Sequence, residues 1–262
     1  MIGETCIDHY VYGKCNRLSP EAPVPIVDVT HTKEVLGMSA NVKENLEKLG
    51  CSVYHITNSN EIIKTRIIDT RYNSQIVRLD EEHGLDTLSL DHIRTLRQDL
   101  IDNAFDAAII SDYNKGFLTP KAISDLVSLI KETNPEISIF VDTKKKDCSP
   151  YSGVILKINE RERSLIEDPG KGNTIITTLG EKGAEYLGVT YPAIKTEVSD
   201  VCGAGDTFIS SLVFAYLCEK RDLKKAIKFS NISSSISVRR LGVYSPTMED
   251  LEKEGVTFEK QR

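Results

Sequence analysis

From residue 89 onward, the apolar residues follow helical spacing and strand spacing in turn. Helical patterns cover residues 90–104, 120–132 and 160–167, and short apolar runs typical of buried strands cover 105–111, 137–142, 154–158 and 174–178. Strands that alternate with helices form right-handed βαβ units. The pattern therefore predicts an α/β fold with a mostly parallel central sheet and helices on both of its faces.

The first third of the chain has a different pattern. Residues 24–29, 62–68 and 74–79 predict strands that are separated by turn residues and not by crossover helices. A helix is predicted at 41–49, ended by Gly50. We expect these strands to form a small antiparallel flap beside the main sheet. Only two residues precede Gly3, where the first strand of the central sheet should lie.

Composition narrows the class of protein. A chain of 262 residues with 40% hydrophobic and 27% charged residues is long enough for one large globular α/β domain. A net charge of −6 argues against binding to nucleic acid or to an anionic membrane. No apolar run approaches the length of a membrane span. The six cysteines include no Cys-x-x-Cys pair, which predicts reduced thiols in a cytoplasmic protein and no zinc site.

The candidate chemistry is concentrated in residues 198–208. Two glycines, Gly203 and Gly205, flank one alanine and precede a long apolar helix predicted at 207–217. A helix N-terminus offers unpaired N–H groups, and glycine lets a ligand approach them closely, so this loop is suited to bind phosphate. Asp206 stands beside it as a proton acceptor. Gly-x-Gly before a helix is also common as a plain tight turn.

The stretch as a whole is more specific than its glycines. Asp200 and residues 203–208 resemble the C-terminal signature of the ribokinase-like, or PfkB, carbohydrate kinases. The resemblance implies that Asp206 is the catalytic base and that Gly203, Ala204 and Gly205 form the anion hole for the transferred phosphoryl group. It also implies a ribokinase-like fold whose small β-lid covers the sugar, with ATP and Mg²⁺ as cofactors. Neither a Walker-type nor a Rossmann-type phosphate loop is present.

The N-terminal residues narrow the resemblance to the heptose 7-phosphate kinases of this family. The match consists of Gly3-Glu4, Asp8, Tyr10, Tyr12-Gly13 and the run from Arg17 to Pro25, which contains Ser-Pro-Glu-Ala-Pro-Val-Pro at 19–25. It implies that Asp8 binds sugar hydroxyls, a task that suits a carboxylate. The 19–25 run also suits a rigid proline-rich connector into a lid strand, and the two interpretations are compatible.

Residues 37–42 resemble the Gly-Gly-Ala-Ala-Asn sugar-binding segment of the family. The resemblance implies that Gly37 and Asn41 contact the sugar, although Asn41 also suits a helix N-cap. Met38 departs from the second glycine of that segment. A side chain at this position hinders close approach of the backbone to a ligand.

Basic residues of the predicted lid are candidates for a substrate phosphate. Lys64 and Arg66 alternate along one strand, so both point to the same face. A solvated basic edge that discourages aggregation is the alternative. The string Ser111–Gly116, which includes Asp112 and Lys115, follows a predicted strand and resembles the Asp-Tyr-x-Lys-Gly of the heptose kinases. It implies that both residues lie at the substrate.

The remaining motifs concern the nucleotide and the metal. Lys157 is followed by Asn159 and Glu162, which match the family's Asn-x-x-Glu motif for ordering magnesium and phosphate. Thr178, Gly180 and Gly183 resemble its nucleotide loop, which is also explained by a plain hairpin turn. Asn231, on a helix with apolar positions 223, 226, 227 and 232, matches a residue beside the adenine.

Together these matches predict one ribokinase-like kinase domain over residues 1–262, with lid strands at about 10–36 and 62–80. The expected substrate is a sugar or sugar phosphate, with heptose 7-phosphate first. The rivals are a kinase for another sugar and a degenerate kinase that acts as a binding or regulatory module. The second is suggested by Met38 and by two segments that are shorter than in the family, one after residue 57 and one between Glu167 and Thr174. Family lids often pair, which implies a homodimer. No His-x-Gly-His motif is present, so no nucleotidyltransferase activity of that type is expected.

Overall fold

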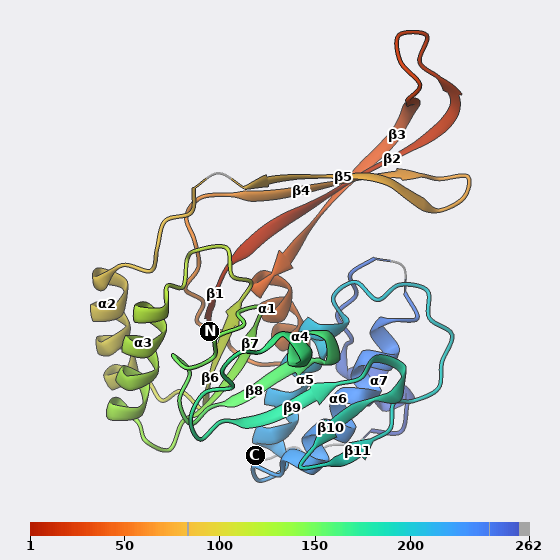
Figure 1. Ribbon diagram of the computed structural model, residues 1–262. Helices are drawn as coiled ribbons and strands as arrows, with labels where there is room; N and C mark the ends of the chain where they lie inside the picture. Colours follow the sequence, from red (N-terminus) through yellow and green to blue (C-terminus); the bar gives the residue numbers. More distant parts are fainter. Residues whose placement is uncertain (83, 241, 257–262) are drawn as a thin grey trace.

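The computed structural model describes residues 1–82, 84–240 and 242–256, and it contains two separate sheets (Figure 1). The central sheet has seven strands in the order β1-β6-β7-β8-β9-β10-β11. They are β1 (Ile2–Gly3), β6 (Ala107–Asp112), β7 (Ser138–Thr143), β8 (Ile155–Asn159), β9 (Thr174–Thr178), β10 (Ala184–Tyr186) and β11 (Val189–Tyr191). Strands β1 to β9 of this sheet are parallel, and β10 and β11 continue it as antiparallel strands. The predicted α/β class is confirmed.

Helices cover both faces of the central sheet. One face packs against α2 (Leu90–Asp102) and α3 (Pro120–Thr133), and the other against α1 (Ser39–Lys48), α5 (Ala204–Cys218) and α6 (Leu223–Ser237). Strand β6 contributes side chains to both faces. Ile110 belongs to the core beneath α2 and α3, and its neighbour Ile109 belongs to the core beneath α5. Successive strand residues point to opposite faces, so a continuous apolar run serves both cores.

Two short helices complete the described part of the chain, α4 (Glu160–Leu165) and α7 (Met248–Lys253). A single 3-10 turn, Gly180–Lys182, links β9 to β10. Among the described residues, no helix is both long and apolar enough to cross a membrane.

Helix α5 begins earlier than its apolar run predicts. Gly203 is the N-cap with φ 77°, a left-handed conformation that glycine adopts without strain, and the helix starts at Ala204. Gly205 and Asp206 therefore lie in the first helical turn and not in the preceding loop, which corrects the prediction. The consequence is favourable for an anion, because the N–H groups of a first turn have no partner within the helix.

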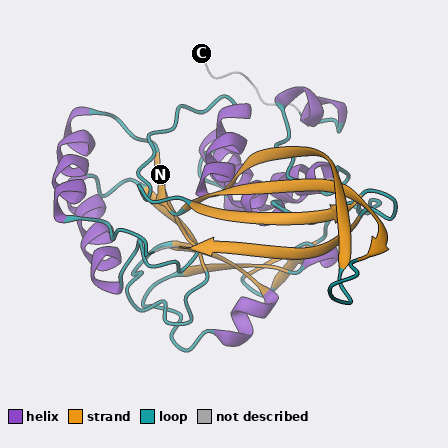
Figure 2. Ribbon diagram, turned by 90° about the horizontal axis from the view of Figure 1, so that it is seen from above, coloured by secondary structure: helices purple, strands orange, loops and turns teal. Residues whose placement is uncertain are grey.

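The second sheet projects from the central body and has four strands in the order β3-β2-β4-β5 (Figures 1 and 2). They are β2 (Thr5–Leu18), β3 (Pro25–Met38), β4 (Ile62–Asp69) and β5 (Ser74–Glu82). The β2–β3 and β4–β5 pairs are antiparallel hairpins. The two hairpins join through β2 and β4, which run parallel, so the expectation of a wholly antiparallel flap was wrong at this junction.

The two sheets are joined by an unusually short connection. Strand β1 contains only Ile2 and Gly3, and a single residue, Glu4, separates it from β2. The extended segment before β4 supports β1 from its other side, because Ile2 pairs with Ile56 and Gly3 donates its N–H to the Ile56 carbonyl at 3.1 Å. One nearly continuous path of chain thus runs from the central sheet into the second sheet.

Candidate active site

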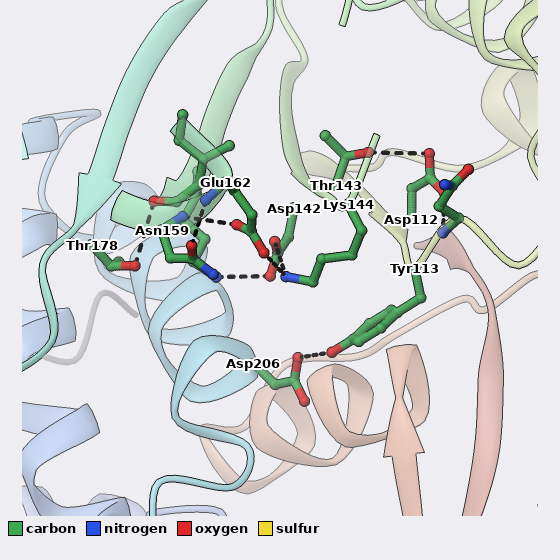
Figure 3. A network of polar contacts seen from close by, with 12 residues as sticks. Asp112, Tyr113, Asp142, Thr143, Lys144, Asn159, Glu162, Thr178 and Asp206 are labelled. Carbon is green, nitrogen blue, oxygen red and sulfur yellow. Dashed lines mark hydrogen bonds and ion pairs between the residues drawn. The ribbon is translucent and has the colours of Figure 1, made fainter. Parts of the chain in front are cut away.

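A cavity of about 1080 Å³ lies where the carboxyl ends of β6 to β9 meet the N-terminus of α5. The sheet side of its wall includes Tyr113, Lys144, Lys157 and Thr178, and the helix side includes residues 203–206. Ligands of open α/β folds bind at this edge of the sheet, because the loops there are free to vary without disturbing the strands. Figure 3 shows the polar network that lines this edge.

Asp206 lies in this cavity with both carboxylate oxygens held. The Tyr113 hydroxyl donates to Oδ1 at 2.6 Å, and the Asn41 amide donates to Oδ2 at 2.8 Å (Figure 3 shows the first contact). The three residues come from different parts of the chain, the loop after β6, helix α1 and helix α5. Sequence motifs indicated Asn41 and Asp206 as site residues but not Tyr113, which lies within the Ser111–Gly116 string.

Burial raises the pKa of Asp206 above its ordinary value, and the nearby Asp142 carboxylate raises it further. The hydrogen bonds from Tyr113 and Asn41 and the Lys157 ammonium act in the opposite direction without cancelling the rise. A carboxylate with a raised pKa accepts a proton more readily than an exposed aspartate does. The environment therefore suits Asp206 to general base catalysis.

The glycine-rich turn carries the second part of the site. A Cβ added at Gly205 would lie 3.0 Å from the Lys157 ammonium, so this side chain sits directly against the start of α5. A Cβ at Gly203 would lie 2.9 Å from the Asn41 amide. The helix N-terminus and a buried ammonium thus meet at one point, where both attract negative charge.

A chain of alternating charges runs along the sheet edge. Lys157 and Asp142 are both buried and form an ion pair at 2.8 Å. Lys144 contacts Asp142 at 3.4 Å and Glu162 at 2.5 Å (Figure 3). Burial opposes the charge on Asp142, but the two ammonium groups outweigh it and lower the pKa of Asp142. Lys144, which directly follows β7, is a further site residue that the sequence analysis did not assign.

Asn159 and Glu162 form a capping box at the start of α4. The side-chain Oδ1 of Asn159 accepts from the backbone N–H of Glu162, and the Glu162 carboxylate accepts from the backbone N–H of Asn159, both at 2.8 Å. The other Glu162 oxygen binds Lys144. In the described ranges, no group of three His, Cys, Asp or Glu side chains could hold a metal. These oxygens fit Mg²⁺ only through its water shell and nucleotide phosphates, a mode that this ion commonly uses.

The wall of the cavity also includes apolar residues, among them Val198, Val201 and Phe208. The predicted nucleotide residues Thr178, Gly180, Gly183 and Asn231 all line it. Asn231 also donates to the Tyr191 carbonyl at 2.8 Å. Gly183 packs so tightly that a Cβ there would lie 2.0 Å from the same carbonyl oxygen, which requires glycine.

The second sheet supplies residues above this edge. Arg66 pairs with Asp8 at 3.1 Å, whereas Lys64 has no ion pair within the described residues and lies over the Tyr113 ring. Gly37 leaves room for Asp8, since a Cβ there would meet the Asp8 carboxylate oxygen at 2.4 Å. The predicted sugar residues Asp8, Gly37, Lys64 and Arg66 thus share one region next to Tyr113.

Asp112 and Lys115 have partners within the protein. Asp112 is fully buried and accepts from the Tyr151 hydroxyl at 2.5 Å and from the Asn114 N–H at 2.8 Å. Lys115 forms a hydrogen bond with Glu82 at 2.8 Å. Neither residue is in the wall of the cavity. These contacts hold the loop after β6, and the substrate contacts expected of both residues stay predictions.

Met38 has φ 57° and ψ −133°, a conformation that strongly favours glycine. Its side chain is buried in a small cluster with Cys6 and Ile62. The backbone at this position thus keeps a glycine-like shape despite the substitution that the sequence analysis noted.

Comparison with known proteins identifies the class of this fold and site. Residues 84–251 match the family described as pfkB family carbohydrate kinase, and the chain belongs to this family. A curated relative, the bifunctional protein HldE of Nitratiruptor sp., is 31% identical over 97% of the chain. HldE of Helicobacter acinonychis is 33% identical over 96%. The chain spans 64% and 65% of the lengths of these two relatives.

Solved structures show the same fold at low sequence identity. Escherichia coli phosphofructokinase-2, in complex with substrates and products, has a TM-score of 0.73 at 16% identity, with 97% of both chains covered. Arabidopsis thaliana ribokinase, complexed with ribose and ATP, has a TM-score of 0.70 at 14% identity, with 96% of both chains covered. The ribokinase-like fold expected from the sequence is confirmed.

Proposed function

We propose that the protein transfers the γ-phosphoryl group of ATP to a hydroxyl of a sugar phosphate, with the anomeric hydroxyl of heptose 7-phosphate as the first candidate. The observation that carries this proposal is the position of Asp206, a buried carboxylate with a raised pKa in the first turn of α5, next to Gly205 and Lys157. A base beside an anion site is what phosphoryl transfer to a hydroxyl requires. The similarity to HldE supports the heptose substrate.

In this mechanism, Asp206 accepts the proton of the sugar hydroxyl while the hydroxyl oxygen forms its bond to the γ-phosphorus. The bond from that phosphorus to the bridging oxygen breaks, and ADP leaves. The N–H groups of residues 203–206 and the Lys157 ammonium stabilise the negative charge on the transferred group. Mg²⁺ neutralises nucleotide phosphate charge when bound, and Asn159 and Glu162 would hold its water shell. Thr178, Gly180, Gly183 and Asn231 would bind the nucleotide.

Lys64 is proposed to bind the phosphate that the substrate already carries. It has no ion pair among the described residues, and it lies over the Tyr113 ring at 5.9 Å. Asp8, Arg66, Gly37 and Asn41 are proposed to contact the sugar. A charge-assisted hydrogen bond to phosphate is worth roughly 1.5–3 kcal/mol.

The substrate assignment is tested with a panel of free and phosphorylated sugars and ATP. We expect heptose 7-phosphate to be preferred, and we expect Lys64→Met to raise its KM roughly 10-fold or more while the KM of free sugars changes little. Lys224→Met, an exposed lysine near the start of α6, is the matched control. Equal activity on unphosphorylated ribose or fructose would reject the heptose assignment and leave a kinase for another sugar. Absence of transfer to every compound would favour a binding module.

We also propose that the second sheet pairs with that of another copy. Its face directed away from the cavity carries Ile7, Leu36, Ile63, Val77 and Leu79 in neighbouring strands. Leu36, Val77 and Leu79 are each more than 40% exposed, and they share this face with His9, Glu34 and Glu81. Its exposed apolar side chains are open to a partner. A like face on a second copy would bury both.

Analytical ultracentrifugation tests this pairing. We expect the wild-type protein to sediment as a dimer at micromolar concentration, and Leu79→Glu to sediment as a monomer, because a carboxylate in an apolar interface is costly to desolvate. Leu187→Glu, at the exposed turn between β10 and β11, is the control and should leave the dimer intact. A monomeric wild-type protein contradicts the pairing.

A further inference from the structure

The carboxylate of Asp206 is held by Asn41, a residue that the sequence already indicated, and by Tyr113, which it did not. Tyr113 and Asn41 each donate a hydrogen bond to one of its two oxygens, so rotation of the carboxylate about the Cβ–Cγ bond would break both bonds. The side chain of Asn41 is itself held, because the Asn45 side-chain amide donates to Oδ1 of Asn41 at 3.0 Å. Tyr113 lies in a loop and not on a helix or strand, so its position depends on contacts from other parts of the chain.

Glu4 holds the backbone of that loop. One oxygen of its carboxylate accepts the Tyr113 N–H at 2.7 Å, and the other accepts the Lys115 N–H at 3.0 Å. Glu4 is completely buried. Burial, followed by the neighbouring Asp112 carboxylate, raises the pKa of Glu4, and its two backbone hydrogen bonds partly offset that rise. A buried carboxylate that accepts two N–H groups of one loop fixes the position of that loop.

Two ammonium groups fix the ring of Tyr113. Lys64 from β4 lies 5.9 Å from the ring centroid, and Lys144 from the loop after β7 lies 5.5 Å from it. Burial and the Asp206 carboxylate raise the pKa of Tyr113 well above 10, so its hydroxyl stays protonated and donates. The side chain is therefore constrained at its backbone, its ring and its hydroxyl.

We propose that Tyr113 is a positioning residue for the base Asp206. Glu4 acts through Tyr113, because its carboxylate accepts backbone N–H groups of the Tyr113 loop and so fixes where Tyr113 lies. The inference rests on the proposed function, because positioning matters only where Asp206 accepts a proton. The Tyr113 hydroxyl orients the carboxylate, and its hydrogen bond favours the ionised form that is needed for proton acceptance. Neither Tyr113 nor Glu4 takes up the proton of the substrate.

Several groups act on the titration of Asp206, and they come from every neighbouring element. Tyr113 follows β6, Asn41 lies on α1, Asp142 lies at the end of β7 and Lys144 directly after it, and Lys157 lies on β8. A Tyr113→Phe variant removes one hydroxyl from this set and keeps the ring that lies near Lys64 and Lys144. The pKa of Asp206 in this variant therefore reports on that hydrogen bond alone.

The experiment measures the pKa of Asp206 directly in the full chain without ligands, by ¹³C NMR titration of aspartate carboxyls assigned with Asp206→Asn. We expect Tyr113→Phe to raise this pKa by roughly one unit, and Glu4→Gln to raise it by less. Tyr216→Phe, which removes a buried hydroxyl bonded to Ser138 at the far end of α5, should leave it unchanged. An unchanged pKa in Tyr113→Phe overturns the inference.

Steady-state kinetics with ATP and heptose 7-phosphate provide the second readout. We expect kcat of Tyr113→Phe to fall roughly 10-fold or more, with the KM for ATP little changed, and the acid limb of the kcat/KM profile to move to higher pH. A purely structural role would lower thermal stability without moving this limb. If the wild-type protein transfers no phosphoryl group to any sugar, the proposed function fails, whereas the NMR titration still decides whether Tyr113 controls Asp206.

Discussion

Replacement of Asp206 by asparagine is expected to lower turnover by about 10²–10⁴-fold, the usual cost of removing a general base. Asparagine has nearly the same shape as aspartate, so the fold and the first turn of α5 should persist. What is lost is the ability to accept a proton at the oxygens that Tyr113 and Asn41 hold at 2.6 and 2.8 Å. The measurement is kcat with saturating ATP and sugar phosphate, together with calorimetric titration of ATP.

The matched control for this variant is Asp222→Asn, which exchanges the N-cap of α6 for another good N-cap residue. It should leave both turnover and nucleotide binding unchanged. Turnover of Asp206→Asn within a few-fold of the wild type would remove Asp206 from the role of base. Loss of ATP binding in the same variant would indicate a structural defect in place of a missing base.

Replacement of Lys157 by methionine is expected to destabilise the folded protein by about 3–5 kcal/mol, since it leaves the buried Asp142 carboxylate without its main partner. Lys144 stays within 3.4 Å of Asp142, which favours the lower end of this range. The same change removes the ammonium beside Gly205, so ATP binding should weaken as well. Urea unfolding and calorimetry measure the two effects separately.

The pH dependence of this penalty has a definite sign. Because the pKa of Asp142 is lowered in the folded state, the stabilisation by the ion pair is complete above the ordinary aspartate pKa and is lost as the pH falls through the lowered one. The penalty of Lys157→Met should therefore shrink in acid. The double variant Lys157→Met/Asp142→Asn should recover part of the stability, and Lys225→Met, which breaks an exposed pair with Glu219, should change little. An equally small change for Lys157→Met would show that the buried pair is not needed for stability.

Local patterns predicted much of the central body. Strand β9 was placed correctly at Thr174–Thr178, and the helices and strands between residues 90 and 165 were placed within a few residues, because their apolar faces repeat with a clear period. Strand β2 was not predicted, because polar and apolar residues do not alternate regularly along it. Cys6, Asp8 and Tyr10 on one face and Ile7 and His9 on the other mix polar and apolar types, so neither face stands out.

The candidate site was predicted where a motif is contiguous and missed where contacts cross the chain. Residues 203–206 are neighbours in sequence, and their chemistry could be argued from the apolar helix that follows them. The Tyr113–Asp206 contact joins residues that are 93 positions apart, and Glu4 contacts Tyr113 across 109. These contacts arise because β1 lies beside β6 in the central sheet. The spacing of residues within one segment does not reveal which strands become neighbours.

The single-residue joint at Glu4 makes the two sheets mechanically dependent on each other. Strand β1 is anchored in the central sheet beside β6, and β2 leaves for the second sheet directly after Glu4. The residue at this joint is also the one whose carboxylate accepts the N–H groups of Tyr113 and Lys115. A chimera that receives the second sheet of another kinase must therefore keep Glu4 with the central body, because its carboxylate holds the loop of Tyr113 there.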